Sequence, residues 1–341
     1  MDLISIVMPV FNAESYLDES IASILSQNYK KFEFIIINDG STDRSLQIIQ
    51  KYADCDSRIC VISEGKLGLI AALNLGIQRA KGYWIARMDA DDISMPNRLE
   101  RQLEYIELND LDVCGTWGKR FGSSTANIKL PCIHDELIID LLFKSSFIHP
   151  SIMFKKEVFD HVQYSDGYKH AEDYHLWVEM AANGNKLGNL PEVMILYREH
   201  NHQVSSINSS EQKRVTAVIR SEYLENFLAM NGLDAKQFEL LVCNFDSLHL
   251  LPDCGCNLLL KIYSQLKRSQ RDYYAERIGM QYAILSEVSN RPLIPYLKFS
   301  ILSGSFSYKN FIYIFVSIMI PRKYRIVFRD FCRQLMVEVQ Q

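Results

Sequence analysis

The sequence predicts an α/β protein with a Rossmann-like mixed sheet, helices on both of its faces, and a mainly helical C-terminal region. Residues 3–10 and 32–37 are continuous apolar runs, the pattern of strands buried on both faces of a parallel sheet. Each run leads into a polar turn and then into apolar residues at helical spacing. This strand–helix alternation recurs four times in about 110 residues, which is typical of an open α/β sheet.

The expected elements follow in chain order. Strands are predicted at 3–10 (ended by Pro9), 32–37, 59–62 and 83–88, with a helix rich in alanine and leucine at 67–80. The stretch 111–205 is mixed, with strands at 112–115, 152–154 and 193–198 and helices at 136–143 and from 171 to near 184. Helices dominate from about 210, at 213–230, 236–245, 257–266 and 273–288. We therefore divide the chain into residues 1–208 and 209–341.

Composition indicates an ordinary globular protein, with 48% hydrophobic and 23% charged residues in a chain of 341. No N-terminal signal pattern is visible, and the apolar run 311–320 is about half the length that spans a bilayer, so no transmembrane segment is expected. The eight cysteines contain no CxxC pair, which favours free thiols in a reducing cytosol.

Charge is distributed unevenly along the chain. The net charge of −4 argues against nucleic acid as a partner. Residues 1–256 carry 24 basic and 36 acidic side chains, whereas residues 257–341 carry 13 and 5. Aromatic and basic side chains interleave over 292–329, which is compatible either with helices that have a solvated basic face or with docking on an anionic membrane surface.

Polar side chains gather where the predicted strands end. Phe11 and Asn12 follow the first strand, Asp39 the second, and the acidic turn Asp89-Ala90-Asp91-Asp92 the fourth. Ligands of open α/β sheets bind beyond these carboxyl ends. Three carboxylates in four residues repel one another, and they are tolerable in water or when a divalent cation and its polyphosphate neutralise them. A solvated acidic turn is the alternative.

Several motifs in a fixed order resemble the inverting, nucleotide-sugar-dependent glycosyltransferases of family 2, which have the GT-A fold. They are SIVMPVFN, INDGSTD, DADD with a downstream Pro-x-Arg-Leu, EDYHLW and YREHNHQVS, and together they cover residues 3–205. Among members of this family, the motifs most resemble those of bacterial enzymes that build O-antigen or capsule repeat units.

The resemblance implies roles for the acidic turn and for one histidine. Asp89 would lie on the ribose side, and Asp91 would bind Mn²⁺ or Mg²⁺, which suits one or two carboxylates plus phosphate oxygens. His200, in the Tyr-Arg-x-His position, would complete the metal or pyrophosphate site. His202 is a rival, because alternate residues of an extended segment point to the same side. The role of Asp92 stays open.

Asp173 is the predicted catalytic base. A single displacement with inversion needs one carboxylate to take the proton from the acceptor hydroxyl, and a helix N-terminus favours the anion. Glu172 would bind an acceptor hydroxyl. The alternative is that both are N-terminal helix carboxylates without chemistry.

The nucleotide would be held by Asp39, through a uracil imide or a ribose hydroxyl, and by a base pocket that Pro9 and Phe11 line. A helix cap is the alternative role for Asp39, as it is for Asn12. The family's pyrophosphate-contacting arginine is replaced by Leu73, and Lys66 and Arg87 are possible substitutes. Arg87 precedes Asp89 by two residues on a strand and so shares its face.

These features predict a cytoplasmic, metal-dependent inverting glycosyltransferase, peripheral at the inner face of the cell membrane. By the habit of the family that it resembles, it would move a hexose from a UDP-sugar to a lipid-linked (undecaprenyl-diphosphate) acceptor and form a β-linkage. A processive synthase should have transmembrane helices and Gln-x-x-Arg-Trp, and a sugar-nucleotide pyrophosphorylase a glycine-rich first loop, none of which the sequence contains. A non-catalytic sugar-nucleotide-binding or scaffold protein remains the alternative. His149, before the strand at 152–154, has either an acceptor-side or a structural role.

Overall fold

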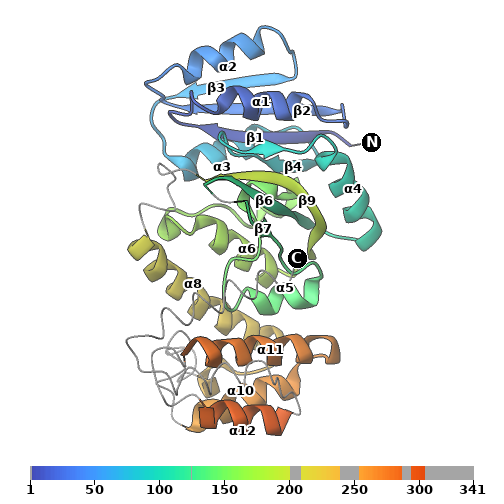
Figure 1. The fold of residues 1–341 in the computed structure, drawn as a ribbon, viewed down its shortest axis with the longest axis vertical. Helices are drawn as coiled ribbons and strands as arrows, with labels where there is room; N and C mark the ends of the chain where they lie inside the picture. Colours follow the sequence, from blue (N-terminus) through green and yellow to red (C-terminus); the bar gives the residue numbers. More distant parts are fainter. Residues whose placement is uncertain (1, 124, 200–208, 239–252, 286–292, 304–341) are drawn as a thin grey trace. The chain divides into compact units, whose positions relative to one another are not determined.

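The computed structural model describes the whole chain except residues 1, 124, 200–208, 239–252, 286–292 and 304–341 (Figure 1). By its contacts the chain divides into two compact units, Met1–Ile219 and Arg220–Gln341, and each is described by itself. His200, His202 and most of the basic stretch 292–329 lie outside the described residues.

The first unit is built on a mixed nine-stranded sheet with the order β3-β2-β1-β4-β8-β6-β9-β5, with β7 paired to β6. The strands are β1 (Ile4–Val10), β2 (Phe32–Asp39), β3 (Ile59–Glu64), β4 (Trp84–Arg87), β5 (Ile93–Ser94), β6 (Val113–Gly122), β7 (Asn127–Ile128), β8 (Met153–Lys155) and β9 (Leu187–Glu199). β3, β2, β1 and β4 are mutually parallel, as predicted, and β8 runs antiparallel to both β4 and β6.

Helices cover both faces of the sheet. Those of the first unit are α1 (Leu17–Leu25), α2 (Ser45–Ala53), α3 (Leu69–Arg79), α4 (Arg98–Asn109), α5 (His134–Asp140) and α6 (Glu172–Ala182). Single 3₁₀ turns occur at His149–Ser151, Lys156–Asp160 and Asp166–Tyr168.

β1 shows how the two faces are divided. Its seven residues are all buried. Ile4, Ile6 and Met8 belong to one core cluster with apolar residues of α1, α2 and α4. On the opposite face α3 approaches so closely that a Cβ at Gly76 would lie 2.6 Å from side-chain atoms of Val7 and Ile37. This alternation is the period-2 pattern of a strand buried on both sides.

The predicted elements of this unit are confirmed, with different ends. β6 and β9 are longer than expected because they pair over most of their length, with an irregularity around Trp117. Pro9 does not end β1 but lies inside it. β4 pairs with β1 only as far as Val7, so β1 has a partner on one side alone where the proline lacks its N–H.

The link between β4 and β5 decides where the acidic turn lies. Residues 88–92 join two strands that are consecutive in the chain but four places apart in the sheet order. β5 pairs antiparallel with β9, at Ile93↔Leu196 and Ser94↔Ile195. The acidic turn therefore lies between the end of β4 and the C-terminal part of β9.

The described part of the second unit is helical, as expected. Helix α8 (Ser209–Met230) begins in the first unit, and a 3₁₀ turn (Ala235–Phe238), α10 (Asp253–Gln265), α11 (Arg268–Leu285) and α12 (Leu293–Ser303) follow. Buried apolar side chains of α10, α11 and α12 form its interior, including Leu259, Tyr274 and Phe299. None of the helices among the described residues is long and apolar enough to cross a bilayer.

Candidate active site

The predicted site residues gather at the carboxyl edge of the parallel strands. The register pairs Val10 with Asn38 and Val7 with Arg87. Parallel strands end on the same side, so Phe11, Asp39 and the acidic turn follow three adjacent strands at one edge. This juxtaposition agrees with the sequence prediction.

The acidic turn has the composition and geometry of a divalent-cation site. One carboxylate oxygen from each of Asp89, Asp91 and Asp92 lies within 4.8 Å of the other two. Asp92 is buried, and its Oδ1 accepts a hydrogen bond of 2.8 Å from the Arg198 N–H. Its Oδ2 is buried without a hydrogen-bond partner among the described residues. Because such an oxygen is costly unless something positive approaches it, these residues fit a cation.

Arg87 lies behind this turn. Its side chain is 4% exposed, and its Nη1 donates to Asp89 Oδ2 in an ion pair, so the two share a face as predicted. Burial raises the pKa of Asp89, and the Arg87 guanidinium opposes that rise. The Nε of Arg87 is buried and has no hydrogen-bond partner in the described part of the chain. Arg87 is thus enclosed beside Asp89 rather than displayed on the surface.

Arg98, from the Pro-x-Arg-Leu segment, fixes the end of β4 from inside the core. It is fully buried, and its Nη2 donates to the carbonyls of Arg87 at 3.0 Å and Ile152 at 3.3 Å. Its Nε donates to Gln102 Oε1 at 2.9 Å. Burial lowers the pKa of Arg98 to about 9. The arginine of this motif is therefore a support for the strand that ends in the acidic turn.

Asp39, the last residue of β2, is 5% exposed and organises the start of α3. Its Oδ1 accepts from the Leu67 N–H at 2.5 Å, and both of its oxygens accept from the Gly68 N–H. Gly40 and Gly68 both have positive φ, and a Cβ at Gly40 would lie 3.1 Å from the Lys66 nitrogen. Asp39 caps α3, the third element after β2, and not α2, the helix that follows it.

The predicted base pocket is partly exposed. Phe11 is 45% exposed, and the Lys66 Nζ lies 4.8 Å from the centre of its ring. Pro9 is buried in β1 beneath this edge. Asn12, at φ 50°, binds the neighbouring turn, because its Oδ1 accepts from the Thr42 N–H at 2.8 Å. Leu73 is fully buried, so the position of the missing family arginine faces the core.

The start of α6 supplies the second acidic group. Glu172 and Asp173 are its first two residues, and the N-cap residue Ala171 makes no side-chain hydrogen bond. Burial, followed by the Glu172 charge, raises the pKa of Asp173 to about 6, against the opposing effects of backbone hydrogen bonds and of the Arg87 guanidinium. Burial also raises the pKa of Glu172. Asp173 is a carboxylate that is ionised at neutral pH and can accept a proton near pH 6.

A buried pair of rings, Tyr164 and His149, lies beside these groups. The Tyr164 hydroxyl is 2.7 Å from His149 Nε2, and the Tyr164 carbonyl accepts from Asn74 Nδ2 at 2.9 Å. Burial lowers the pKa of His149 well below its ordinary value, and Arg87 adds to this effect. His149 is therefore neutral at pH 7 and has the structural hydrogen bond that was one of its two predicted roles.

Two residues of β9 belong to the site although the sequence did not single them out. Burial raises the pKa of Tyr197, and the charges of Asp89, Asp92 and Asp91 raise it further, which places its hydroxyl near the acidic turn. Arg198 contacts the turn directly, as described below. Both residues belong to the YREH segment, from which only His200 was predicted as a site residue. The position of Tyr197 and Arg198 in the same motif is the feature of the sequence that could have indicated them.

Comparison with known proteins identifies the class of enzyme to which this fold and site belong. The model of the family described as "Glycosyl transferase family 2" matches residues 5–163. An uncharacterized glycosyltransferase of Haemophilus influenzae is 36% identical over 251 residues, which are 69% of this chain and 77% of that protein. The chain belongs to glycosyl transferase family 2.

Two further comparisons bear on the subfamily and the fold. The O-antigen biosynthesis glycosyltransferase WbnJ of Escherichia coli is 38% identical over 208 residues, 59% of this chain and 81% of WbnJ. The crystal structure of residues 1–349 of S. aureus TarS in complex with UDP-GlcNAc matches with a TM-score of 0.54 at 16% identity, over 96% of this chain and 91% of that one. The fold is GT-A-like, with a helical C-terminal region.

Proposed function

We propose that this glycosyltransferase moves a hexose from a UDP-sugar to a lipid-linked saccharide, with inversion, in the assembly of an O-antigen or similar polysaccharide. The observation that carries the proposal is that the acidic turn and Asp173, at the start of α6, interact electrostatically, since the Asp173 charge raises the pKa of Asp89. The acidic turn fits a cation and a diphosphate, and Asp173 fits a general base. Similarity to WbnJ and the UDP-GlcNAc complex of TarS support the acceptor pathway and the donor class.

Asp91 would hold Mn²⁺ or Mg²⁺, with Asp92 beside it, and Asp89 would lie on the ribose side, within reach of the same cation. Such a cation supplies neutralisation of the charge that develops on the diphosphate leaving group. The buried Oδ2 of Asp92, which has no hydrogen-bond partner in the part of the chain that the structure describes, supports this assignment. His200 is proposed as a further ligand on the family resemblance alone, with His202 as its rival.

The protein's own groups would bind the two substrates on either side of the anomeric carbon. Asp39, Pro9, Phe11 and Lys66 would hold the nucleotide; the exposed Phe11 ring with Lys66 over it offers a face for a base. Arg87 contributes positive charge from behind Asp89. Because Arg87 is buried, we propose that it stabilises Asp89 and Asp173 as anions and does not contact the phosphates directly.

Transfer would be a single displacement. Glu172 would orient the acceptor, and Asp173 would take the proton from the acceptor hydroxyl as its oxygen bonds to the anomeric carbon. The bond from that carbon to the diphosphate oxygen breaks as UDP leaves, which gives a β-linkage from an α-linked donor. A base with a pKa of about 6 is ionised at neutral pH and still basic enough to accept the proton.

A lipid-linked acceptor places the reaction at a membrane surface. We propose that the protein works in the cytoplasm, on the inner face of the cell membrane, where its basic C-terminal residues contact anionic lipid. The excess of 13 basic over 5 acidic side chains in residues 257–341 supports this. Sedimentation with vesicles rich in anionic lipid at low salt is expected, and an equal lack of binding to anionic and neutral vesicles would contradict it.

The function is tested with purified protein, a panel of nucleotide sugars, Mn²⁺, and synthetic GlcNAc- or GalNAc-diphosphate-lipid acceptors. One UDP-sugar is expected to be consumed in the presence of acceptor, with loss of activity on chelation and a β-linked product by NMR. Asp173→Asn should bind the UDP-sugar but not turn it over. If wild type and Asp173→Asn both bind UDP-sugar and neither transfers it to any acceptor, the non-catalytic binding or scaffold role is correct instead.

A further inference from the structure

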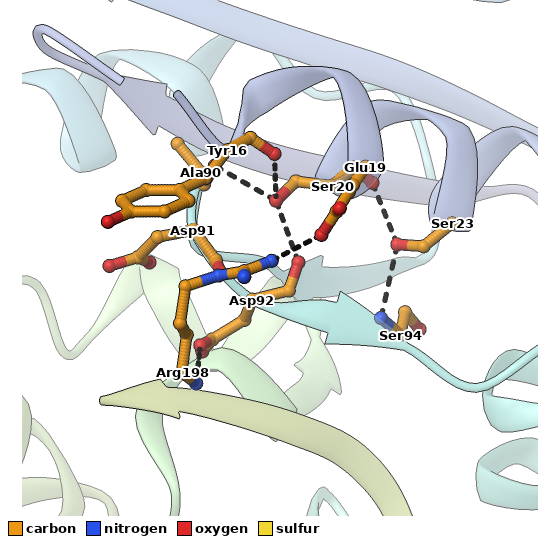
Figure 2. A network of polar contacts seen from close by, with 9 residues as sticks. All are labelled: Tyr16, Glu19, Ser20, Ser23, Ala90, Asp91, Asp92, Ser94 and Arg198. Carbon is orange, nitrogen blue, oxygen red and sulfur yellow. Dashed lines mark hydrogen bonds and ion pairs between the residues drawn. The ribbon is translucent and has the colours of Figure 1, made fainter. Parts of the chain in front are cut away.

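Arg198, near the C-terminal end of β9, connects three separate parts of the chain around the acidic turn. Its Nε donates to the Asp91 carbonyl at 2.7 Å, and its backbone N–H donates to Asp92 Oδ1 at 2.8 Å. Its Nη2 forms an ion pair of 2.5 Å with Glu19 Oε2 on α1. Figure 2 shows this guanidinium between the turn and α1, while the Asp91 carboxylate points away from the helix.

The guanidinium is fixed in this position by two aromatic rings. Its central carbon lies 4.6 Å from the centre of the Tyr16 ring and 4.4 Å from that of Phe121. The Arg198 side chain is 15% exposed. Planar stacking and a fork of donors are properties of arginine that lysine does not share.

α1 holds the same turn from its other side. The Ser20 hydroxyl is fully buried and lies 2.9 Å from the Ala90 carbonyl and 2.7 Å from the Asp92 carbonyl. One turn further along α1, the Ser23 hydroxyl accepts from the Ser94 N–H at 3.1 Å (Figure 2). The backbone of residues 90–94 is therefore fastened to α1, and Arg198 fastens it to β9.

The geometry points to Arg198 as a positioning residue for the cation site: its guanidinium fixes the Asp91 backbone, beside the backbone N–H that holds Asp92 Oδ1, so that the remaining oxygens converge. This inference rests on the proposed function, because it takes the acidic turn to bind a cation. Three carboxylates held within 4.8 Å of one another repel. Without the Arg198 guanidinium the Asp91 backbone loses its tie to β9, although α1 still holds the Ala90 and Asp92 carbonyls, and part of the convergent arrangement must be restored each time a cation binds.

Residues that orient metal ligands typically change metal affinity or activity by about 10–100-fold when they are removed. Arg198→Ala is therefore expected to raise the Mn²⁺ dissociation constant by about 10–100-fold and the Mn²⁺ concentration for half-maximal activity to match. Saturating Mn²⁺ should recover most of the turnover, because Asp173 and the nucleotide pocket are untouched. Arg198→Lys, which keeps the charge but loses the fork, should stay close to the alanine variant.

Arg101→Ala is the matched control. Arg101 on α4 also joins a helix to β9, through an ion pair of 2.5 Å with Glu192, but it does not contact the acidic turn. It should leave the Mn²⁺ response unchanged. Glu19→Gln serves as a second test variant, since it loosens the Arg198 guanidinium without altering the turn, and we expect a shift in the Mn²⁺ dissociation constant below the lower bound of about 10-fold expected for Arg198→Ala.

Mn²⁺ binding is measured by calorimetry with UDP present, beside the melting temperature of the metal-free protein. A raised Mn²⁺ dissociation constant in Arg198→Ala or Arg198→Lys, with that of Arg101→Ala unchanged, supports the inference. A lowered melting temperature with wild-type Mn²⁺ affinity would overturn it and leave only a structural role. If Arg198→Ala does not fold, the Mn²⁺ dissociation constants of Arg198→Lys and Glu19→Gln test the inference by the same criteria. Absence of Mn²⁺ binding by the wild-type protein overturns the proposed metal site itself, which is a separate result.

Discussion

The acidic turn and the start of α6 both present carboxylates to the same region, but the protein holds them by different means. The turn is fastened by hydrogen bonds to its backbone and to Asp92, from Ser20 and Arg198. Asp173 is conditioned mainly by burial, which raises its pKa to about 6. Arg87 opposes the rise in the pKa of both Asp89 and Asp173.

This difference matches what each group would have to do. A cation site needs fixed oxygens, so hydrogen bonds to the turn suit it, and the Arg87 guanidinium favours the ionised form of Asp89 against the effect of burial. A general base needs a tuned proton affinity, and burial at a helix N-terminus provides that. Four predictions test the metal site and the general base separately, from the largest expected effect to the smallest.

Asp173→Asn should lower turnover by about 10²–10⁴-fold, because the amide cannot accept the acceptor's proton. Binding of the UDP-sugar should stay within about twofold of wild type, since the pocket is unchanged. Turnover is measured under saturating donor and acceptor, and donor binding by calorimetry. An active Asp173→Asn enzyme would show that another group is the base.

Asp91→Asn should lower turnover at moderate Mn²⁺ by about 10²–10³-fold, because a charged ligand is lost. Asp92→Asn keeps the oxygen that accepts from the Arg198 N–H and should cost less, with a wild-type melting temperature. The measurement is activity as a function of Mn²⁺ concentration for both variants, with Asp110→Asn, an exposed carboxylate paired with Lys186, as control. Equal losses of turnover in Asp91→Asn and Asp92→Asn would show that Asp91 is not the more important of the two as a metal ligand.

The value of kcat/KM should fall about tenfold per pH unit as the pH drops below about 6, since Asp173 must be ionised to act as a base. Arg87→Met removes a positive charge that favours the ionised form, so the acidic limb should move up by about one pH unit. Arg87→Lys, which keeps the charge, should move less. A limb that stays at the same pH in Arg87→Met would show that Arg87 does not act on the base.

Asp173→Asn should also stabilise the protein. The folded Asp173 has a pKa of about 6 against an ordinary 3.8, so between these values the folded state binds a proton that the unfolded state has lost. This contribution favours folding at low pH and is lost as pH rises through about 6. Asparagine lacks the penalty, so the variant should gain about 1–3 kcal/mol at pH 7 and none near pH 4. Denaturant unfolding at both pH values measures it; a gain at pH 4 as large as at pH 7 would contradict the explanation.

The strands and the edge that carries the site could be predicted from sequence because both depend on local patterns. Buried parallel strands appear in the sequence as apolar runs that end in polar turns, so the positions of Asp39 and Asp89 at strand ends could be predicted, and the helical pattern after residue 171 placed Asp173 at a helix N-terminus. What failed was pairing across the chain. Nothing local indicates that Asp39 caps α3, or that Leu73 faces the core.

The arginines show the same limit. Arg87, Arg98 and Arg198 are alike in sequence, yet one is paired with Asp89, one binds carbonyls in the core, and one joins β9 to the acidic turn. Their burial depends on which strands become neighbours, and the order β4-β8-β6-β9-β5 cannot be read from spacing. The motifs identified the segments that contain these arginines. The different contacts of each arginine became apparent only from the fold.

The path from β4 to β5 has an entropic consequence. The six Cα–Cα steps from Arg87 to Ile93 reach at most about 20–22 Å, and the four strand spacings between β4 and β5 would take up about 19 Å in a flat sheet. Since part of that path is a turn, the sheet has to curl for the chain to close it. The acidic turn is then a short segment with both ends anchored in the sheet. A ligand that binds there loses little free energy to the ordering of the turn, because its backbone is already fixed. Little of its binding energy goes into organising a loop, so a modest number of contacts can yield useful affinity.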